Sequence, residues 1–243
     1  MIVAVLAIVF YQPIKNAVIG TTPGDIVPRT CIENAVKKAI DTTMMQGGRV
    51  NPQLYFNYNN VKVAYSCYTL DWYKTCVMQI PLLKQTIENE AAVLAQKDVN
   101  TCFSEAVKKV ESKGYTVKTT GTKKITISFQ PKKIIVTPDF SATISKADTP
   151  SSIYPSDRFK TTINSNDYDI IMIASSIQNF EAHYGDSEII TYMSFYPNLK
   201  VEKIKQDDGT KVYVISDRDT KEKLQMATRS QPWPPGLAMS TGI

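Results

Sequence analysis

Histidine is almost missing from the sequence: His183 is the only one among 243 residues. Nucleophilic catalysis by serine or cysteine usually borrows an imidazole as its base, so such a mechanism has a single candidate here. His183 stands between Glu181 and Asp186 at the end of a predicted helix, where an exposed histidine is the plainer interpretation. We therefore predict no catalytic role for it.

Signature motifs of common enzyme classes are missing as well. The chain contains no GxSxG, no P-loop, no GxGxxG and no HExxH. Asp139, Asp217 and Asp219 would form a paired-carboxylate site only if the fold brought them together, and nothing in their spacing selects them. The sequence therefore predicts a protein that is not an enzyme and that has no cofactor and no metal site.

Blocks of a single charge are also missing. The chain has 28 basic and 23 acidic residues, a net charge of +5. A nucleic-acid-binding protein concentrates its lysines and arginines on one face, which predicts clustered rather than scattered positions. The paired lysines are instead spread along the chain, at Lys37-Lys38, Lys108-Lys109, Lys123-Lys124 and Lys132-Lys133. We therefore predict no nucleic-acid partner.

The four cysteines lack the close CxxC spacing of a zinc site. Four cysteines allow three disulfide pairings, and of these we favour Cys31 with Cys102, between two helical segments, and Cys67 with Cys76, across a turn. Disulfides would indicate an oxidising, extracytoplasmic location. Four buried thiols remain the alternative, because free cysteine is itself commonly buried.

The longest apolar run occupies residues 1–11 and stops at Gln12-Pro13. Eleven helical residues reach only about 16 Å, about half of a bilayer's hydrocarbon core. A signal peptide would carry a basic residue ahead of its apolar segment, but no basic residue precedes Lys15. Three interpretations stay open: part of a longer membrane helix continuing past Pro13, a segment that packs with its own copies, or an ordinary buried strand or helix. The residues expected to mediate anchoring or assembly are Ile2, Val3, Val5, Leu6, Ile8, Val9 and Phe10.

Helical periodicity predicts several amphipathic helices after a linker at residues 20–29. The first begins with a capping box formed by Thr30 and Glu33 and ends at Gly47-Gly48. Two more cover about 81–97 and 103–112. A fourth begins at Asn164 or Ser165, buries a stripe of isoleucines and ends at Gly185. A short helix is expected at about 187–194.

Strand signals are strongest in the second half of the chain. Alternating apolar residues predict an antiparallel meander over 115–144, and Asp207-Asp208-Gly209 predicts a hairpin joining 200–205 to 211–216, with a third strand at 224–229. An earlier strand is expected at 61–68. Residues 50–60 and 148–155 have the composition of loops. The expected fold is α+β: an N-terminal hydrophobic helix (1–19), a linker (20–29), a helical and hairpin subdomain (30–112) and an antiparallel β-rich α+β subdomain (113–243).

Aromatic residues are concentrated in one short region. Such side chains, apolar in body and polar at the tip, suit an interface, a sugar surface or the edge of a bilayer, although packing against neighbouring helices is the simpler explanation. The candidate binding residues are Tyr55, Tyr58, Tyr65, Tyr68, Trp72 and Tyr73. They make a surface or glycan partner the alternative functional hypothesis, that of a membrane-tethered binding module or adhesin.

The order of elements resembles that of pilin-like proteins: an apolar N-terminal segment broken by Pro13, a helical region, antiparallel strands and downstream cysteines. The resemblance implies that the N-terminal helix forms a filament core, or a membrane anchor before assembly, while an α+β head faces outward. We therefore expect an exported, extracytoplasmic structural protein at the cell surface. It would associate with itself or with a membrane through residues 1–19, and the resemblance implies no activity beyond self-assembly.

Overall fold

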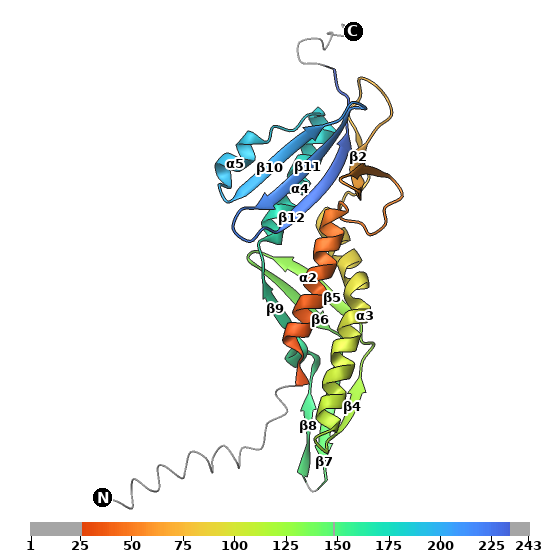
Figure 1. Cartoon of the computed structure of the whole chain (residues 1–243), viewed down its shortest axis with the longest axis vertical. Helices are drawn as coiled ribbons and strands as arrows, with labels where there is room; N and C mark the ends of the chain where they lie inside the picture. Colours follow the sequence, from red (N-terminus) through yellow and green to blue (C-terminus); the bar gives the residue numbers. More distant parts are fainter. Residues whose placement is uncertain (1–25, 148, 234–243) are drawn as a thin grey trace, which may run out of the picture.

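The computed structural model describes residues 26–147 and 149–233 (Figure 1). The helices are α2 (Arg29–Met45), α3 (Leu83–Glu111), α4 (Asp167–Tyr184) and α5 (Ile190–Phe195), with a short 3-10 helix, η2 (Ser156–Phe159). The strands are β1 (Tyr55–Tyr58), β2 (Val61–Tyr68), β3 (Val77–Met78), β4 (Thr116–Thr120), β5 (Ile125–Gln130), β6 (Lys133–Pro138), β7 (Ser141–Lys146), β8 (Thr149–Tyr154), β9 (Thr161–Asn164), β10 (Leu199–Lys205), β11 (Thr210–Asp217) and β12 (Lys223–Arg229). The predicted α+β class is confirmed, whereas the predicted N-terminal helix lies outside the described residues.

The molecule is elongated, with a head at one end and a stalk at the other (Figure 1). The head contains the sheet β1-β2-β12-β11-β10, with β3 paired to β2, together with α4 and α5. The stalk contains α2, α3 and two three-stranded sheets, β5-β6-β9 and β4-β7-β8. Strand β2 runs parallel to β12, so the head sheet is mixed rather than purely antiparallel. This pairing joins the two segments that the sequence divided at residue 112.

Helix α2 agrees with the predicted first helix, but its predicted capping box is wrong. The helix begins at Arg29 after Pro28, no side chain caps it, and Glu33 instead pairs with Lys37 at 3.3 Å. A proline is well suited to the helix start because its missing N–H would have no partner there. The periodic stripe, which includes Ile32 and Val36, is buried against the stalk.

The two predicted helices at 81–97 and 103–112 are one continuous helix, α3. Its buried positions keep a spacing of three or four residues through the point where a break was expected: Ile87, Ala91, Ala95, Val99, Cys102, Ala106 and Val110. Such spacing keeps one face of a single helix against the core. Helix α2 packs along this face, and the disulfide between Cys31 and Cys102 joins the two helices with a Cα–Cα distance of 5.9 Å.

The loop predicted at residues 50–60 is wrong in part, because β1 lies within it and forms a hairpin with β2. The turn consists of Asn59 and Asn60, with φ of 49° and 63°. Two consecutive left-handed residues match the right-handed twist of the flanking strands, and asparagine tolerates this conformation better than most residues.

The predicted meander at 115–144 forms antiparallel strands, but their pairing differs from a simple meander. Strand β4 pairs with β7 rather than with β5. Strands β5 and β6, which lie between them in the sequence, form a hairpin in the other sheet. The loop predicted at 148–155 contains β8, which pairs with β7. Strand β9, which pairs with β6, was not predicted from the sequence.

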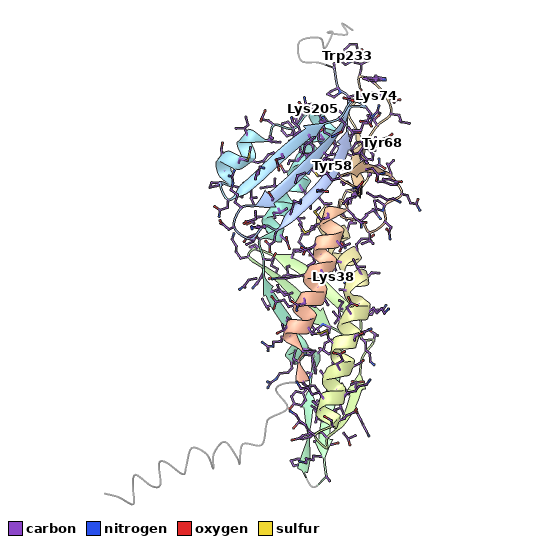
Figure 2. All side chains as sticks on the ribbon, viewed as in Figure 1. Lys38, Tyr58, Tyr68, Lys74, Lys205 and Trp233 are labelled. Carbon is purple, nitrogen blue, oxygen red and sulfur yellow. A yellow bond between two sulfur atoms is a disulfide. The ribbon has the colours of Figure 1, made fainter. Side chains whose placement is uncertain are left out.

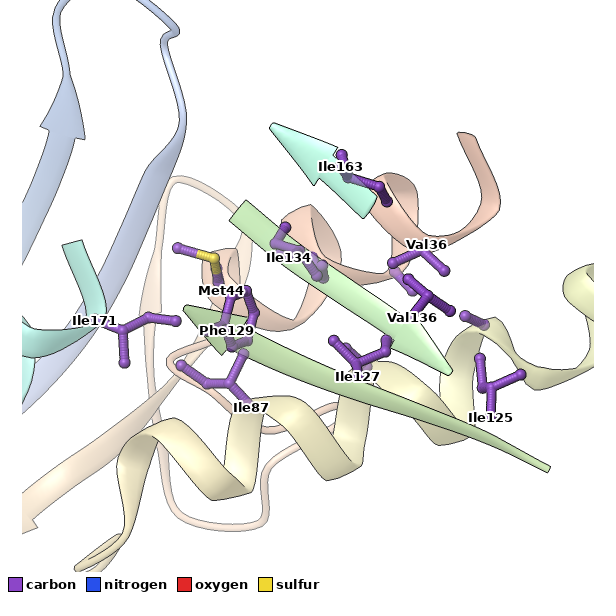
Figure 3. Close-up of a cluster of buried hydrophobic side chains, with 14 of the residues drawn as sticks. Val36, Met44, Ile87, Ile125, Ile127, Phe129, Ile134, Val136, Ile163 and Ile171 are labelled. Atoms are coloured by element: carbon purple, nitrogen blue, oxygen red, sulfur yellow. The ribbon is translucent and has the colours of Figure 1, made fainter. Parts of the chain in front are cut away.

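The sheet β5-β6-β9 covers the paired helices of the stalk and supplies its core (Figure 3). Alternate residues face inward, so that Ile127 opposes Val136, Phe129 opposes Ile134, and Ile134 also opposes Ile163. All five are at most 3% exposed. Each such side chain stabilises the fold by about 1.5 to 3 kcal/mol relative to an exposed one.

In the head, β1 and β3 were not predicted and α4 begins at Asp167 rather than after Asn164 or Ser165, whereas the end of α4 and the strands β10 to β12 agree with expectation. Helix α4 ends at Gly185, whose φ of 81° is the left-handed conformation expected at a helix end. The hairpin of β10 and β11 and the following strand β12 are all present. One further disulfide joins Cys67 to Cys76, so both pairs favoured from the sequence are formed and no described cysteine is free.

Candidate functional site

The six aromatic residues predicted as a binding surface fall into two groups. Four lie on the β1–β2 hairpin: Tyr55, Tyr58, Tyr65 and Tyr68. The other two, Trp72 and Tyr73, lie in the loop between β2 and β3 and are 66% and 53% exposed. The structure therefore does not bring all six onto one surface.

The tyrosines of the hairpin mainly pack within the head. Tyr65 is buried, and its hydroxyl group forms a hydrogen bond of 2.7 Å with the Oγ1 atom of Thr210. Burial raises the pKa of Tyr65, and the hydrogen bond with Thr210 only partly offsets this. Tyr58 and Tyr68 are half-buried against a small cluster that contains Val63 and Ala227. These tyrosines therefore pack within the head, but against strands of its sheet rather than against neighbouring helices as the simpler explanation had it.

Trp72 and Tyr73 instead line a pocket of about 400 Å³ at the tip of the head, which we call the tip pocket. Trp233 completes its aromatic wall, with its ring stacked on that of Tyr73 at 4.0 Å between centroids and 18° between planes. Figure 2 shows Trp233, Lys74 and Lys205 at this end of the molecule, well away from Lys38 in the stalk. Trp233 was not predicted as a site residue, because its only local signal is an irregular Pro-Trp-Pro segment.

The loop that carries Trp72 and Tyr73 is held at both ends. The disulfide between Cys67 and Cys76 closes it, and the backbone N–H of Cys76 donates to the Oγ atom of Ser230 at 3.0 Å. In its middle, the N–H of Gln231 donates to the carbonyl oxygen of Lys74, also at 3.0 Å. The loop and residues 230–233, which we call the C-terminal segment, thus fix each other's position.

Two glycines let the C-terminal segment lie close to the head. A Cβ atom on Gly185 would be 2.3 Å from the Cγ atom of Pro232, and one on Gly209 would be 2.2 Å from the Nε2 atom of Gln231. Both glycines also have a positive φ, near 81° and 82°, which other residues rarely adopt. These close contacts place Trp233 against the tip pocket.

Asp186 lines the tip pocket and lies close to three lysines, of which Lys205 and Lys211 also line it. Its Oδ1 atom lies 3.0 Å from the Nζ atom of Lys203 and 3.5 Å from that of Lys211, and its Oδ2 atom lies 3.9 Å from Lys205. Burial by itself would raise the pKa of Asp186, but the hydrogen bond from Lys203 and the three ammonium charges hold it below its usual value. Asp186 is therefore ionised at neutral pH.

A buried ion pair underlies the pocket. The Nζ atom of Lys211 lies 2.7 Å from the Oε2 atom of Glu181 and donates to the carbonyl oxygen of Gly185 at the end of α4. The other carboxylate oxygen of Glu181 accepts hydrogen bonds from the hydroxyl group of Tyr213 and, at 2.9 Å, from the N–H of Ser187. Burial and the charge of Glu181 raise the pKa of Tyr213, so this tyrosine stays neutral. These contacts tie α4 to β11.

The residues considered for catalysis do not form a site. The Nδ1 atom of exposed His183 lies 2.8 Å from the carbonyl oxygen of Asn179, one helical turn before it. Asp139 accepts hydrogen bonds from Thr122 in the stalk, whereas Asp217 accepts the N–H groups of Asp219 and Thr220 in a turn of the head. Within the described ranges, no group of three or more histidine, cysteine or acidic residues is placed to hold a metal ion.

A second charged region lies where the stalk meets the head, around Asp167 in the first turn of α4. Asp167 is 4% exposed, and it borders a pocket of about 290 Å³ also lined by Asp41 of α2 and Glu222 of the β11–β12 turn. The pKa of Asp167 is raised to about 7, chiefly by burial and then by the negative charges of Glu222 and Asp41, while the Ser165 hydrogen bond and the charge of Lys37 offset part of this rise. The folded protein therefore binds this proton more tightly than the unfolded chain does.

We expect this carboxyl group to make the head–stalk junction less stable as pH rises. The pKa of an ordinary aspartate is 3.8 and that of Asp167 in the folded protein is about 7, so the free energy of unfolding falls as the pH rises from about 4 to 7. Replacing Asp167→Asn should leave the free energy of unfolding nearly unchanged near pH 4 and raise it by about 2 kcal/mol near pH 8, about half of the full linkage energy because the adjoining pocket admits solvent. Urea unfolding at a series of pH values measures the difference.

The matched control for this prediction is Asp169→Asn, in the same helical turn. Asp169 is more exposed and pairs with Lys132 at 3.3 Å, so its replacement reports the loss of a charge near the start of α4 without relief of burial. An Asp167→Asn variant with the same difference from the parent at every pH would contradict the prediction.

Across residues 26–147 and 149–233, none of the helices combines the length and the apolar character needed to cross a lipid bilayer. Comparison of the chain with protein families, curated proteins and solved structures found no match.

Proposed function

We propose that the protein is an exported structural protein of the cell surface, held by its apolar N-terminal segment, residues 1–19, and resembling a pilin subunit in layout. The segment would pack with copies of itself in a filament or insert into a membrane. The stalk and head would then project from it.

The observation that carries this proposal is that the described chain begins on the stalk side of the molecule and ends at the tip of the head. The described chain enters at the start of α2, whose first residues lie toward the stalk end, and it leaves at the tip of the head (Figure 1). Whatever holds residues 1–19 would therefore hold the stalk side, with the tip pocket facing away. The two disulfides support export, because such bonds persist in oxidising compartments.

We expect the full chain to sediment as assemblies, or with lipid vesicles, when detergent is absent. Introducing two charges into the apolar segment, Val5→Glu together with Val9→Glu, should release most of the protein into the soluble fraction, since buried carboxylates in an apolar contact are strongly unfavourable. Sedimentation with and without vesicles, followed by electron microscopy of the pellet, distinguishes the lipid contact from self-assembly.

The matched control places the same two charges elsewhere. Val77 and Val93 are 67% and 79% exposed in the head and on α3, so Val77→Glu with Val93→Glu adds equal charge without touching residues 1–19. This variant should sediment like the parent. The proposal fails if the parent, with residues 1–19 intact, stays monomeric in light scattering without detergent.

A second candidate function is a binding module at the cell surface. One observation favours it: Trp72 and Tyr73 are exposed beside a pocket at the end of the molecule farthest from the start of the stalk. Exposed aromatic residues that line a concave site commonly mark binding. This function is compatible with the first, since anchoring uses one end of the chain and binding the other.

A further inference from the structure

The tip pocket exposes three aromatic rings at one place. Trp72 is 66% exposed, Tyr73 is 53% exposed and Trp233 is 48% exposed. A single exposed aromatic side chain needs no explanation, but three around one pocket leave a large apolar area in contact with water. The flat faces offer a platform on which a ligand's own flat, apolar face can stack.

Polar groups stand around these rings. The half-buried amide group of Gln206 makes no hydrogen bond with any described residue, and neither do the indole N–H groups of Trp72 and Trp233. The carboxylate of Asp186 and the ammonium group of Lys205 add an acceptor and a donor. The pocket thus pairs an apolar platform with a mixed set of donors and acceptors.

This combination matches the chemistry of a sugar ring. A hexopyranose has a face of C–H groups that stacks on an aromatic ring, and hydroxyl groups around its edge that both donate and accept hydrogen bonds. The volume of about 400 Å³ lies within the range of small-ligand pockets. The pocket is also preorganised, because the disulfide, the Gln231–Lys74 hydrogen bond and the two close glycines fix its walls before binding.

The charges argue against the other ligand that stacks on aromatic rings, a single-stranded nucleic acid. Such binding needs cations that are free to neutralise phosphates. Here the Nζ atom of Lys74 lies 2.9 Å from Asp71, and Lys203 and Lys205 both face Asp186. Asp71 and Asp186 thus already neutralise these ammonium groups in part, which leaves them less able to bind a phosphate backbone, whereas both carboxylates and ammonium groups can still bond to neutral sugar hydroxyls.

We propose that the tip pocket is a saccharide-binding site that takes a neutral hexopyranose, the end unit of a surface glycan. The sugar stacks on Trp72 beside the Tyr73–Trp233 pair, and its hydroxyl groups bind Gln206, Asp186 and Lys205. The inference rests on the proposed surface location for its biological meaning, but the pocket's chemistry does not depend on how residues 1–19 are held.

The chain offers a direct reporter of this site. Its only two tryptophans are Trp72 and Trp233, and both line the pocket, so tryptophan fluorescence reports the tip pocket alone. We expect the full chain, titrated with the methyl glycosides of glucose, galactose, mannose and N-acetylglucosamine, to show a saturable fluorescence change with at least one of them. Gln206→Ala, which keeps both tryptophans, should weaken that binding about tenfold.

Ligand-observed NMR extends the test to the stacking residue. Trp72→Ala should abolish binding of the same glycoside, and Trp72→Phe should restore part of it, while circular dichroism shows the fold unchanged. The matched control is Phe195→Ala, which removes a ring that is 77% exposed on α5, outside the pocket, and should bind like the parent.

Three results would overturn the inference: no saturable change with any of the four glycosides, an equal loss of binding in Phe195→Ala, or saturation by oligothymidylate in place of the sugars. A failed titration would leave the proposed anchoring intact, because that function is measured by sedimentation. A failed sedimentation test would likewise leave sugar binding standing.

Discussion

Replacing Lys211→Met should destabilise the protein by about 3 to 5 kcal/mol, because it leaves the carboxylate of Glu181 buried without its partner. Lys211 is 6% exposed and Glu181 is fully buried, and their ionised groups lie 2.7 Å apart. The remaining donors to Glu181, the hydroxyl group of Tyr213 and the N–H of Ser187, are neutral and offset only part of the loss. Urea unfolding at neutral pH measures the change.

The double variant Lys211→Met with Glu181→Gln tests the reason for this loss. A glutamine keeps an oxygen acceptor for Tyr213 and Ser187 but carries no charge, so most of the stability should return. The matched control is Lys205→Met, on the neighbouring strand, whose side chain is 69% exposed and whose loss should change stability by no more than about 0.5 kcal/mol. A Lys211→Met variant as stable as this control would contradict the prediction.

Local patterns in the sequence were sufficient for much of the fold. The 3.6-residue period located α2 and α4, and Asp208-Gly209 located the β10–β11 hairpin, because these elements depend on residues close together in the chain. The break predicted before Phe103 was wrong for a related reason. The buried spacing continues from Val99 through Cys102 to Ala106, so the local pattern is that of one helix and not of two.

Long-range pairing was beyond such reasoning. Strand β2 pairs with β12 across about two thirds of the chain, and β4 passes over the β5–β6 hairpin to pair with β7. Alternation shows which face of a strand is buried but does not identify its neighbour. The predicted order of elements was therefore nearer to the structure than the predicted arrangement of sheets.

The candidate site shows the same limit. Trp72 and Tyr73 were identified from their aromatic neighbourhood, but that neighbourhood also contains the packed tyrosines of the β1–β2 hairpin. Asp186 and Trp233 come from distant parts of the chain: Asp186 follows the end of α4, and Trp233 reaches the pocket because Gly185 and Gly209 leave room for Gln231 and Pro232. The sequence therefore predicted an aromatic binding surface, but which aromatic residues are exposed together depends on the fold.

Removing the disulfide between Cys31 and Cys102 should cost about 4 kcal/mol, since it closes a loop of 71 residues and so restricts the unfolded chain strongly. For a protein of this size, the Cys31→Ala, Cys102→Ala variant should melt about 10 °C below the parent in calorimetry. The matched variant Cys67→Ala, Cys76→Ala opens a loop of only 9 residues, for which the same relation gives about 2.5 kcal/mol.

The position of the first disulfide gives this stabilisation a mechanical meaning under the proposed function. Cys31 lies in the first turn of α2, where the described chain enters the stalk, and Cys102 lies within α3. A pull on residues 1–19 would therefore pass directly into α3 rather than unwinding α2 from its start. The variant lacking this bond should lose α2 to proteases that cut at its lysines, while the Cys67→Ala, Cys76→Ala variant should keep it. A variant lacking Cys31 and Cys102 that melts with the parent and resists cleavage equally would show that packing between α2 and α3 alone holds the stalk.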